Sequence, residues 1–154
     1  MTSYIKPIEI RWSDLDPNFH LRHSVYYDFG AYIRMCFLTE NGLNTSVLMQ
    51  HNLGPILFRE ECIFKREIHF NDSISINLVL KQCSHSYSRW TMQHEIIKNE
   101  SIVSAIITVD GSWMDTVKRK LTVPSAIVTP TFELLPRAAD FKWIERKGQT
   151  AGEV

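Results

Sequence analysis

Residues 24–40, SVYYDFGAYIRMCFLTE, decide the fold expected for this chain. Ser24 is a suitable N-cap before this stretch, and Asn41-Gly42 supplies a stop signal after it. Gly30 lies in the middle, where glycine costs about 1 kcal/mol relative to alanine, so we expect it to pack closely against a neighbour. Apolar side chains recur at three- and four-residue steps, the spacing of one face of an amphipathic helix: Val25, Phe29, Ile33, Cys36 and Phe37.

Segments on both sides of this helix alternate in the period-2 pattern of β-strands. The turns between them, such as residues 71–72 and 98–100, are too short for a crossover, so neighbouring strands are expected to be antiparallel. One helix with one apolar stripe must pack on one face of such a sheet. We therefore expect an α+β fold in which a long central helix is wrapped by a curved antiparallel sheet of about five strands. The expected strands span residues 5–12, 58–70, 74–80, 87–97 and 102–114.

Length and charge restrict the class of protein. The 154 residues fit one domain, expected over residues 1–123, with a partly irregular C-terminal extension over residues 124–154. Seventeen basic and seventeen acidic residues balance, which removes the main electrostatic argument for binding nucleic acid or an anionic membrane. No apolar run is long enough to span a bilayer, and residues 1–11 show no secretion signal. Three widely separated cysteines do not suggest a disulfide framework, so we expect a cytoplasmic protein.

The densest chemistry lies in residues 12–23, WSDLDPNFHLRH, directly before the helix. A helix N-terminus presents free backbone N–H groups that can hold a developing oxyanion. A nearby carboxylate can attack a carbonyl or activate water. The composition of the loop alone favours an ordinary polar connection, because Asp, Asn and Pro are common in turns.

The segment Ile10-Arg11-Trp12-Ser13-Asp14-Leu15-Asp16, followed by His20, Tyr26 and Arg34, resembles the opening motif of hotdog-fold acyl-CoA thioesterases of the 4-hydroxybenzoyl-CoA thioesterase type. The strand order over residues 4–123 is similar to that fold as well. The resemblance implies hydrolysis of an acyl-CoA thioester to a carboxylate and free CoA, without a cofactor, in a homodimer or tetramer. An acyl-carrier-protein thioesterase and a non-catalytic module that binds acyl thioesters or proteins remain open as alternatives.

The resemblance assigns the catalytic carboxylate to Asp16, as nucleophile or as general base toward water. The chain departs from the family pattern at three places: Phe19 stands where a glycine is usual, Arg22 and His23 replace a usual pair of asparagines, and Ala31 stands where an acidic residue is common. These departures leave room for a different substrate range. Substrate contacts are implied for five residues around the helix start: His20, His23, Ser24, Val25 and Tyr26.

Metal binding and phosphate binding are two further possibilities. Asp14, Asp16, His20 and His23 have the chemistry of metal ligands. No HExxH or facial-triad context surrounds them, so we expect no metal site. The basic residues 118–120 could meet the phosphates of CoA, but such a triplet is more often a solvated turn.

Overall fold

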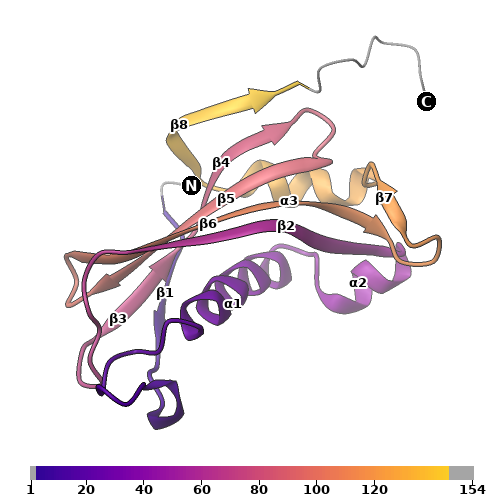
Figure 1. Ribbon diagram of the computed structural model, residues 1–154. Helices are drawn as coiled ribbons and strands as arrows, with labels where there is room; N and C mark the ends of the chain where they lie inside the picture. Colours follow the sequence, from indigo (N-terminus) through magenta and orange to yellow (C-terminus); the bar gives the residue numbers. More distant parts are fainter. Residues whose placement is uncertain (1–2, 146–154) are drawn as a thin grey trace.

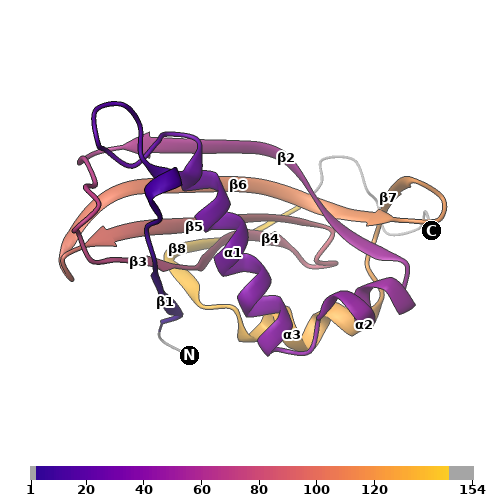
Figure 2. The same ribbon diagram turned by 90° about the horizontal axis from the view of Figure 1, so that it is seen from below.

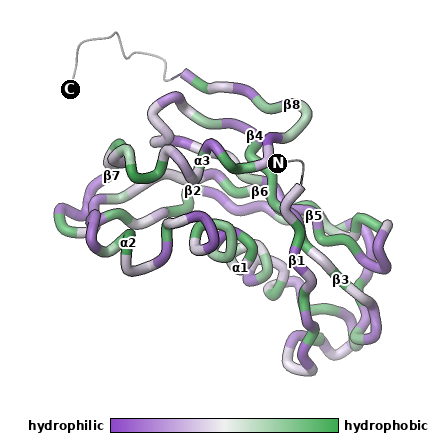
Figure 3. The backbone as a smooth tube through the Cα atoms, turned by 180° about the vertical axis from the view of Figure 1, so that it is seen from behind, coloured by the Kyte–Doolittle hydropathy of each residue, from purple (hydrophilic) through white to green (hydrophobic). Residues whose placement is uncertain are grey.

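The long helix α1 (Val25–Glu40) lies against one face of a curved eight-stranded sheet in the computed structural model, which describes residues 3–145 (Figure 1). Hydrophobic and hydrophilic residues alternate along α1 (Figure 3), as an amphipathic helix requires. Its apolar stripe packs under the sheet, and each of the following residues is at most 9% exposed: Val25, Phe29, Ile33 and Phe37. The expected central helix and hotdog arrangement are therefore confirmed.

The centre of the sheet is β5, which pairs with β6 on one side and with β3 and β4 on the other. β2 lies beyond β6, and β1 lies beyond β3. The expected strand over residues 74–80 is divided at Leu78, and two outer strands of three and eight residues are added, so the sheet exceeds the expected five strands. In chain order the strands are β1 (Ile5–Ile8), β2 (Leu53–Phe64), β3 (Ile74–Asn77), β4 (Val79–Ser84), β5 (Arg89–Lys98), β6 (Ile102–Asp115), β7 (Lys120–Thr122) and β8 (Arg137–Ile144).

The segment after Pro124 continues the layered structure. A 3-10 turn (Ala126–Val128) leads into α3 (Thr129–Leu134), which buries Phe132. α3 crosses over to β8, which pairs with β4 in parallel, while the other strand pairs are antiparallel. Residues 126–144 of the expected extension are thus mostly regular, whereas residues 146–154 lie outside the described residues. None of the helices among residues 3–145 is long and apolar enough to cross a membrane.

The chain leaves the sheet after Phe64, although a strand was expected to continue to residue 70. The backbone N–H groups of Lys65 and Arg66 both donate to the carbonyl of Ser104, at 2.8 and 3.0 Å. Two successive donors on one acceptor break the alternation that a strand needs. The buried Ile68 reaches the core from a loop, in which its carbonyl accepts from the Leu21 N–H at 2.7 Å. Residues 65–73 therefore form a loop against the segment that precedes α1.

Gly30 is packed against a buried polar pair, as its position in mid-helix predicts. A Cβ atom there would lie 3.2 Å from Arg34 Nη1 and 3.3 Å from His94 Cδ2. His94 belongs to β5, so α1 packs closely against β5 at this turn. Figure 2 shows α1 crossing the face of the sheet. After α1 the chain enters the short helix α2 (Thr45–Gln50), in which the Asn44 side chain accepts from the Val47 N–H at 2.9 Å.

Candidate active site

Asp14 and Asp16 lie in different environments, although they are only two residues apart. A 3-10 turn (Trp12–Asp14) ends between them and directs Asp14 inward, where it is 1% exposed. Arg11 donates to its carboxylate from Nη2 and from the backbone N–H, both at 2.9 Å. Burial acts to raise the pKa of Asp14, but the hydrogen bonds with Arg11 outweigh it and the pKa is lowered. Asp14 therefore holds the loop together as a buried carboxylate.

Asp16 stabilises a tight turn with one carboxylate oxygen. Its Oδ1 accepts from the backbone N–H groups of Asn18 at 2.8 Å and His20 at 3.1 Å. The Asp16 N–H donates to the His20 carbonyl at 2.8 Å. Within the described part of the chain, Oδ2 has no hydrogen-bond partner. One oxygen thus fixes the carboxylate while the other remains available for chemistry.

Asp16 lines a polar cavity of about 320 Å³ at the start of α1. Three of the five expected substrate-binding residues, His20, His23 and Tyr26, line the same cavity. Ser24 and Val25 do not. The Ser24 hydroxyl accepts from Arg22 Nε at 2.9 Å instead of capping the helix, and the Val25 side chain is buried in the core.

The first turn of α1 presents backbone donors, and Tyr26 in this turn lines the same cavity as Asp16. The Val25 N–H is engaged by the Arg22 carbonyl at 3.0 Å. Among residues 3–145, no hydrogen-bond partner is found for the N–H groups of Tyr26 and Tyr27. Burial is the largest effect that raises the pKa of the Tyr26 phenol to about 12, and the neighbouring Cys62 and Asp16 groups add to it. This side chain therefore stays protonated at neutral pH.

The opposite wall of the cavity was missed by sequence reasoning. It is formed by Phe64 at the end of β2 and by Lys65, Arg66 and Glu67 in the following loop. The Tyr26 ring packs edge-on against Phe64, with 4.9 Å between ring centroids. Assignment of residues 58–70 to one strand hid this loop. The basic pair at 65–66, rather than the triplet at 118–120, borders the cavity that Asp16 lines.

A second, apolar cavity of about 150 Å³ lies further along α1. Ala31, Met35 and Leu38 of α1 line it, together with Leu57 of β2 and Trp90 of β5. Ala31 follows Tyr26 by five residues, which corresponds to about 8 Å along the helix axis. Five residues also turn about 140° around the helix axis, and the two cavities share no lining residue.

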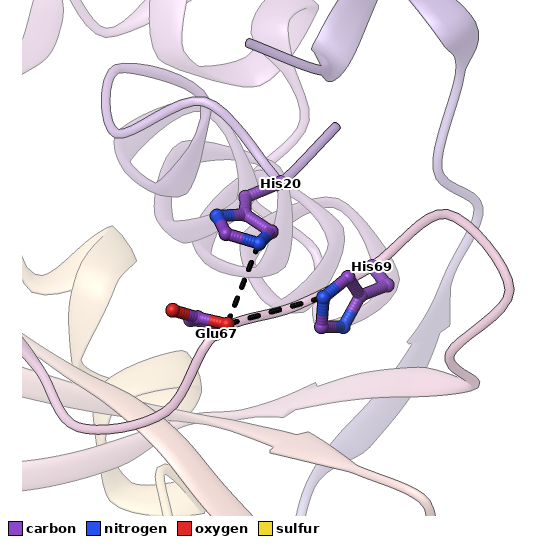
Figure 4. Close-up of side chains that lie close together, drawn as sticks. All are labelled: His20, Glu67 and His69. Atoms are coloured by element: carbon purple, nitrogen blue, oxygen red, sulfur yellow. Dashed lines mark ion pairs between the residues drawn. The ribbon is translucent and has the colours of Figure 1, made fainter. Parts of the chain in front are cut away.

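The four metal-type residues considered from the sequence do not come together. Among the described residues, the group of three that could hold an ion combines His20 with Glu67 and His69 (Figure 4). Asp14, Asp16 and His23 are not part of it.

The arrangement of a long central helix against a curved antiparallel sheet is that of the hotdog class of proteins. A sequence model of the thioesterase-like superfamily matches residues 10–140, and the chain belongs to that family. A comparison with curated proteins found no match.

Solved structures share the fold at low sequence identity. A hypothetical protein from Staphylococcus aureus in complex with CoA superposes with a TM-score of 0.81 at 12% identity, over 99% of this chain and 96% of that one. A hypothetical protein from Aquifex aeolicus gives 0.76 at 19% identity, over 83% and 98%. A 1,4-dihydroxy-2-naphthoyl-CoA thioesterase from Synechocystis gives 0.76 at 14% identity, over 88% and 99%.

Proposed function

We propose that this protein hydrolyses acyl-CoA thioesters and that Asp16 is its catalytic carboxylate. The observation that carries this proposal is the cavity in which Asp16, with one free oxygen, lies beside the first turn of α1. A thioester is already activated, so a positioned carboxylate and a set of hydrogen-bond donors suffice for its hydrolysis.

As general base, Asp16 takes a proton from water while the water oxygen adds to the thioester carbonyl carbon. The carbonyl oxygen becomes an oxyanion and accepts hydrogen bonds from the N–H groups of Tyr26 and Tyr27, aided by the helix dipole. Collapse of the intermediate breaks the C–S bond, and the leaving thiolate takes the proton from Asp16. As nucleophile, Asp16 would add to the same carbon, and the C–S bond would break to release the thiolate and leave a mixed anhydride. Water would then hydrolyse the anhydride, which frees the carboxylic acid and the Asp16 carboxylate and supplies the proton for the thiolate.

The surroundings of the cavity suit an acyl-CoA. The exposed Lys65 and Arg66 at its rim supply positive charge for the CoA phosphates. We assign the acyl group to the apolar cavity along α1, where Ala31 leaves room that an acidic side chain would fill. An acyl-carrier-protein thioester presents the same pantetheine arm, so it remains the alternative substrate.

We further propose a homodimer in which two β2 strands pair edge to edge. Among the described strands β2 pairs only with β6, so its other edge is open. Phe64 belongs both to this edge and to the cavity wall, so the second copy would border the site. Apolar side chains remain exposed along β2: Leu57, Phe58, Ile63 and Phe64.

The variant Asp16→Asn tests the proposal, because it keeps the shape of the side chain and removes its charge. We expect turnover to fall by about a hundredfold or more, on the scale of losing one positioned base. The assay follows free thiol from a panel of acyl groups, each offered on CoA and on a carrier protein. Asp14→Asn is the matched control, and we expect it to lower the melting temperature but to leave the folded enzyme active, because Asp14 faces Arg11.

Near-normal hydrolysis by Asp16→Asn of every thioester that the wild type accepts would contradict the proposed role of Asp16. A wild type that binds acyl-CoA but hydrolyses none of the panel would instead favour a binding module.

A further inference from the structure

Two imidazoles and one carboxylate meet where the loop before α1 touches residues 65–73 (Figure 4). His20 and His69 form an isolated antiparallel bridge, and their rings cross nearly at right angles with 4.8 Å between centroids. The Glu67 carboxylate lies between them. Its Oε2 is 3.4 Å from His20 Nε2 and 3.9 Å from His69 Nε2.

We propose that His20, Glu67 and His69 bind a divalent metal ion of the zinc class. Two imidazoles and a carboxylate are a donor set that Zn²⁺ uses when it keeps an open coordination position. The ligand atoms lie within 4.8 Å of one another. With bonds of about 2.1 Å, tetrahedral ligand atoms are about 3.4 Å apart. The ligand atoms of His20 and Glu67 already have this separation. Rotation of the exposed His69 and Glu67 side chains shortens the remaining distances between ligand atoms.

A second carboxylate, that of Asp72, lies on the side of the His69 ring away from Glu67. Asp72 Oδ2 lies 3.7 Å from His69 Nδ1 and accepts from the His69 backbone N–H at 2.8 Å. Asn99 Nδ2 donates to the other Asp72 oxygen at 3.1 Å, which fixes this carboxylate. A carboxylate behind a ligating histidine orients the ring and strengthens it as a ligand. The arrangement leaves His69 Nε2 facing Glu67.

Occupation of this site would act on Asp16 through His20. The His20 backbone N–H donates to Asp16 Oδ1, and the His20 carbonyl accepts from the Asp16 N–H. His20 and Glu67 also line the cavity that Asp16 borders. A bound ion therefore restrains the Asp16 turn and narrows the cavity, and we expect it to slow hydrolysis.

Titration of chelator-treated protein with zinc chloride in a calorimeter tests the site without reference to activity. We expect one ion per wild-type chain and an affinity at least about tenfold weaker in His69→Gln. The matched control is His51→Gln, which removes an exposed imidazole at the end of α2 and should bind as the wild type does. Because His69 does not line the cavity, His69→Gln should hydrolyse thioesters normally and resist inhibition by zinc.

Equal zinc affinity in the wild type and His69→Gln, or no binding by the wild type, would overturn the proposed site. Zinc that binds the wild type with the expected dependence on His69 but leaves hydrolysis unchanged would overturn its coupling to Asp16. The calorimetric result stands even if the protein hydrolyses no thioester, so the failure of one proposal is distinguishable from failure of the other.

Discussion

Phe19 shows how a single residue can hold a conformation that its chemistry does not favour. Its φ of 63° lies in the left-handed region, where glycine is the usual residue. Its N–H donates to the Asp16 carbonyl at 2.9 Å, in the turn that presents the Asp16 carboxylate. The loop therefore keeps the backbone of the glycine that the family resemblance implies, although a side chain of which 68% is exposed occupies the position.

Replacement of Phe19 by glycine should relieve this strain. We expect Phe19→Gly to stabilise the protein by about 1 kcal/mol, because the gain in the folded turn exceeds the extra freedom of glycine in the unfolded chain. In a domain of this size that is a rise in melting temperature of about 2–4 °C, measurable by calorimetry.

Phe19→Ala serves as the control, since it removes the same exposed ring but keeps the Cβ atom and the strain. An equal rise in melting temperature for both variants would show that the ring, and not the backbone, is responsible.

At this scale the sequence predicts the candidate site only in part. The family resemblance selects Asp16, but spacing alone places Asp14 on the same side of an extended chain. The short turn at residues 12–14 separates the two carboxylates, and the sequence Trp-Ser-Asp carries no clear sign of it. The sequence does not predict Lys65, Arg66 and Glu67 as site residues, because the alternation of apolar residues continues past the last residue of β2.

The elements themselves are predicted unevenly. α1 follows from its periodicity, because a buried helix face requires apolar residues at three- and four-residue steps. β2 is less well predicted: Phe58 and Phe64 alternate like core residues, yet both are about half exposed on an edge strand. Alternation shows which side chains share a face of a strand, and not whether anything covers that face.

A buried polar network joins α1 to the sheet that covers it. Arg34 Nη1 lies 2.9 Å from His94 Nε2, and His94 Nδ1 lies 3.1 Å from the carbonyl of Asn77. Since a guanidinium only donates, Nε2 accepts and Nδ1 carries the hydrogen, so the imidazole is neutral. Glu60 balances the Arg34 charge from β2, with 3.6 Å between Nη2 and Oε2. Burial is the largest effect that lowers the pKa of His94 to about 3, and the Arg34 charge adds to it.

This network should make folding stability depend on pH. In the unfolded chain His94 binds a proton below about pH 6.5, whereas in the folded protein it stays neutral down to about pH 3. The contribution of the neutral His94 to the free energy of unfolding is therefore complete above about pH 6.5. It is lost as the pH falls, by about 1.4 kcal/mol per pH unit. Chemical denaturation at pH 7, 6 and 5 measures the unfolding free energy.

His94→Gln provides the comparison, because an amide can accept from Arg34 and donate to Asn77 without titrating. Between pH 6.5 and 5 we expect the unfolding free energy of His94→Gln to fall less steeply than that of the wild type. The difference between the two slopes should correspond to about one bound proton. Parallel curves for the two proteins would mean that His94 does not resist protonation in the folded state.

For the whole molecule, the question is what covers the free edge of β2. Four of the twelve residues of this strand expose large apolar side chains, at an edge for which residues 3–145 supply no pairing strand, and such an edge is prone to pairing. The sequence cannot reveal this feature, because it depends on which strand the sheet leaves outermost. In a homodimer the edge would be covered, and the cavity that Asp16 lines would lie next to the two-fold interface through Phe64.

A charge placed on this edge should separate the two copies. Ile63 is half exposed on β2, so Ile63→Glu would have to bury a carboxylate in the proposed interface, at a cost of several kcal/mol. We expect light scattering at micromolar concentration to give twice the chain mass for the wild type and the chain mass for Ile63→Glu. Val117→Glu adds the same charge on the exposed turn between β6 and β7 and should remain dimeric. A monomeric wild type would rule out the dimer, and a dimeric Ile63→Glu would place its interface elsewhere.

If dimers form through β2, Ile63→Glu should also lose thioester hydrolysis while it stays folded, because the second copy borders the cavity beside Phe64.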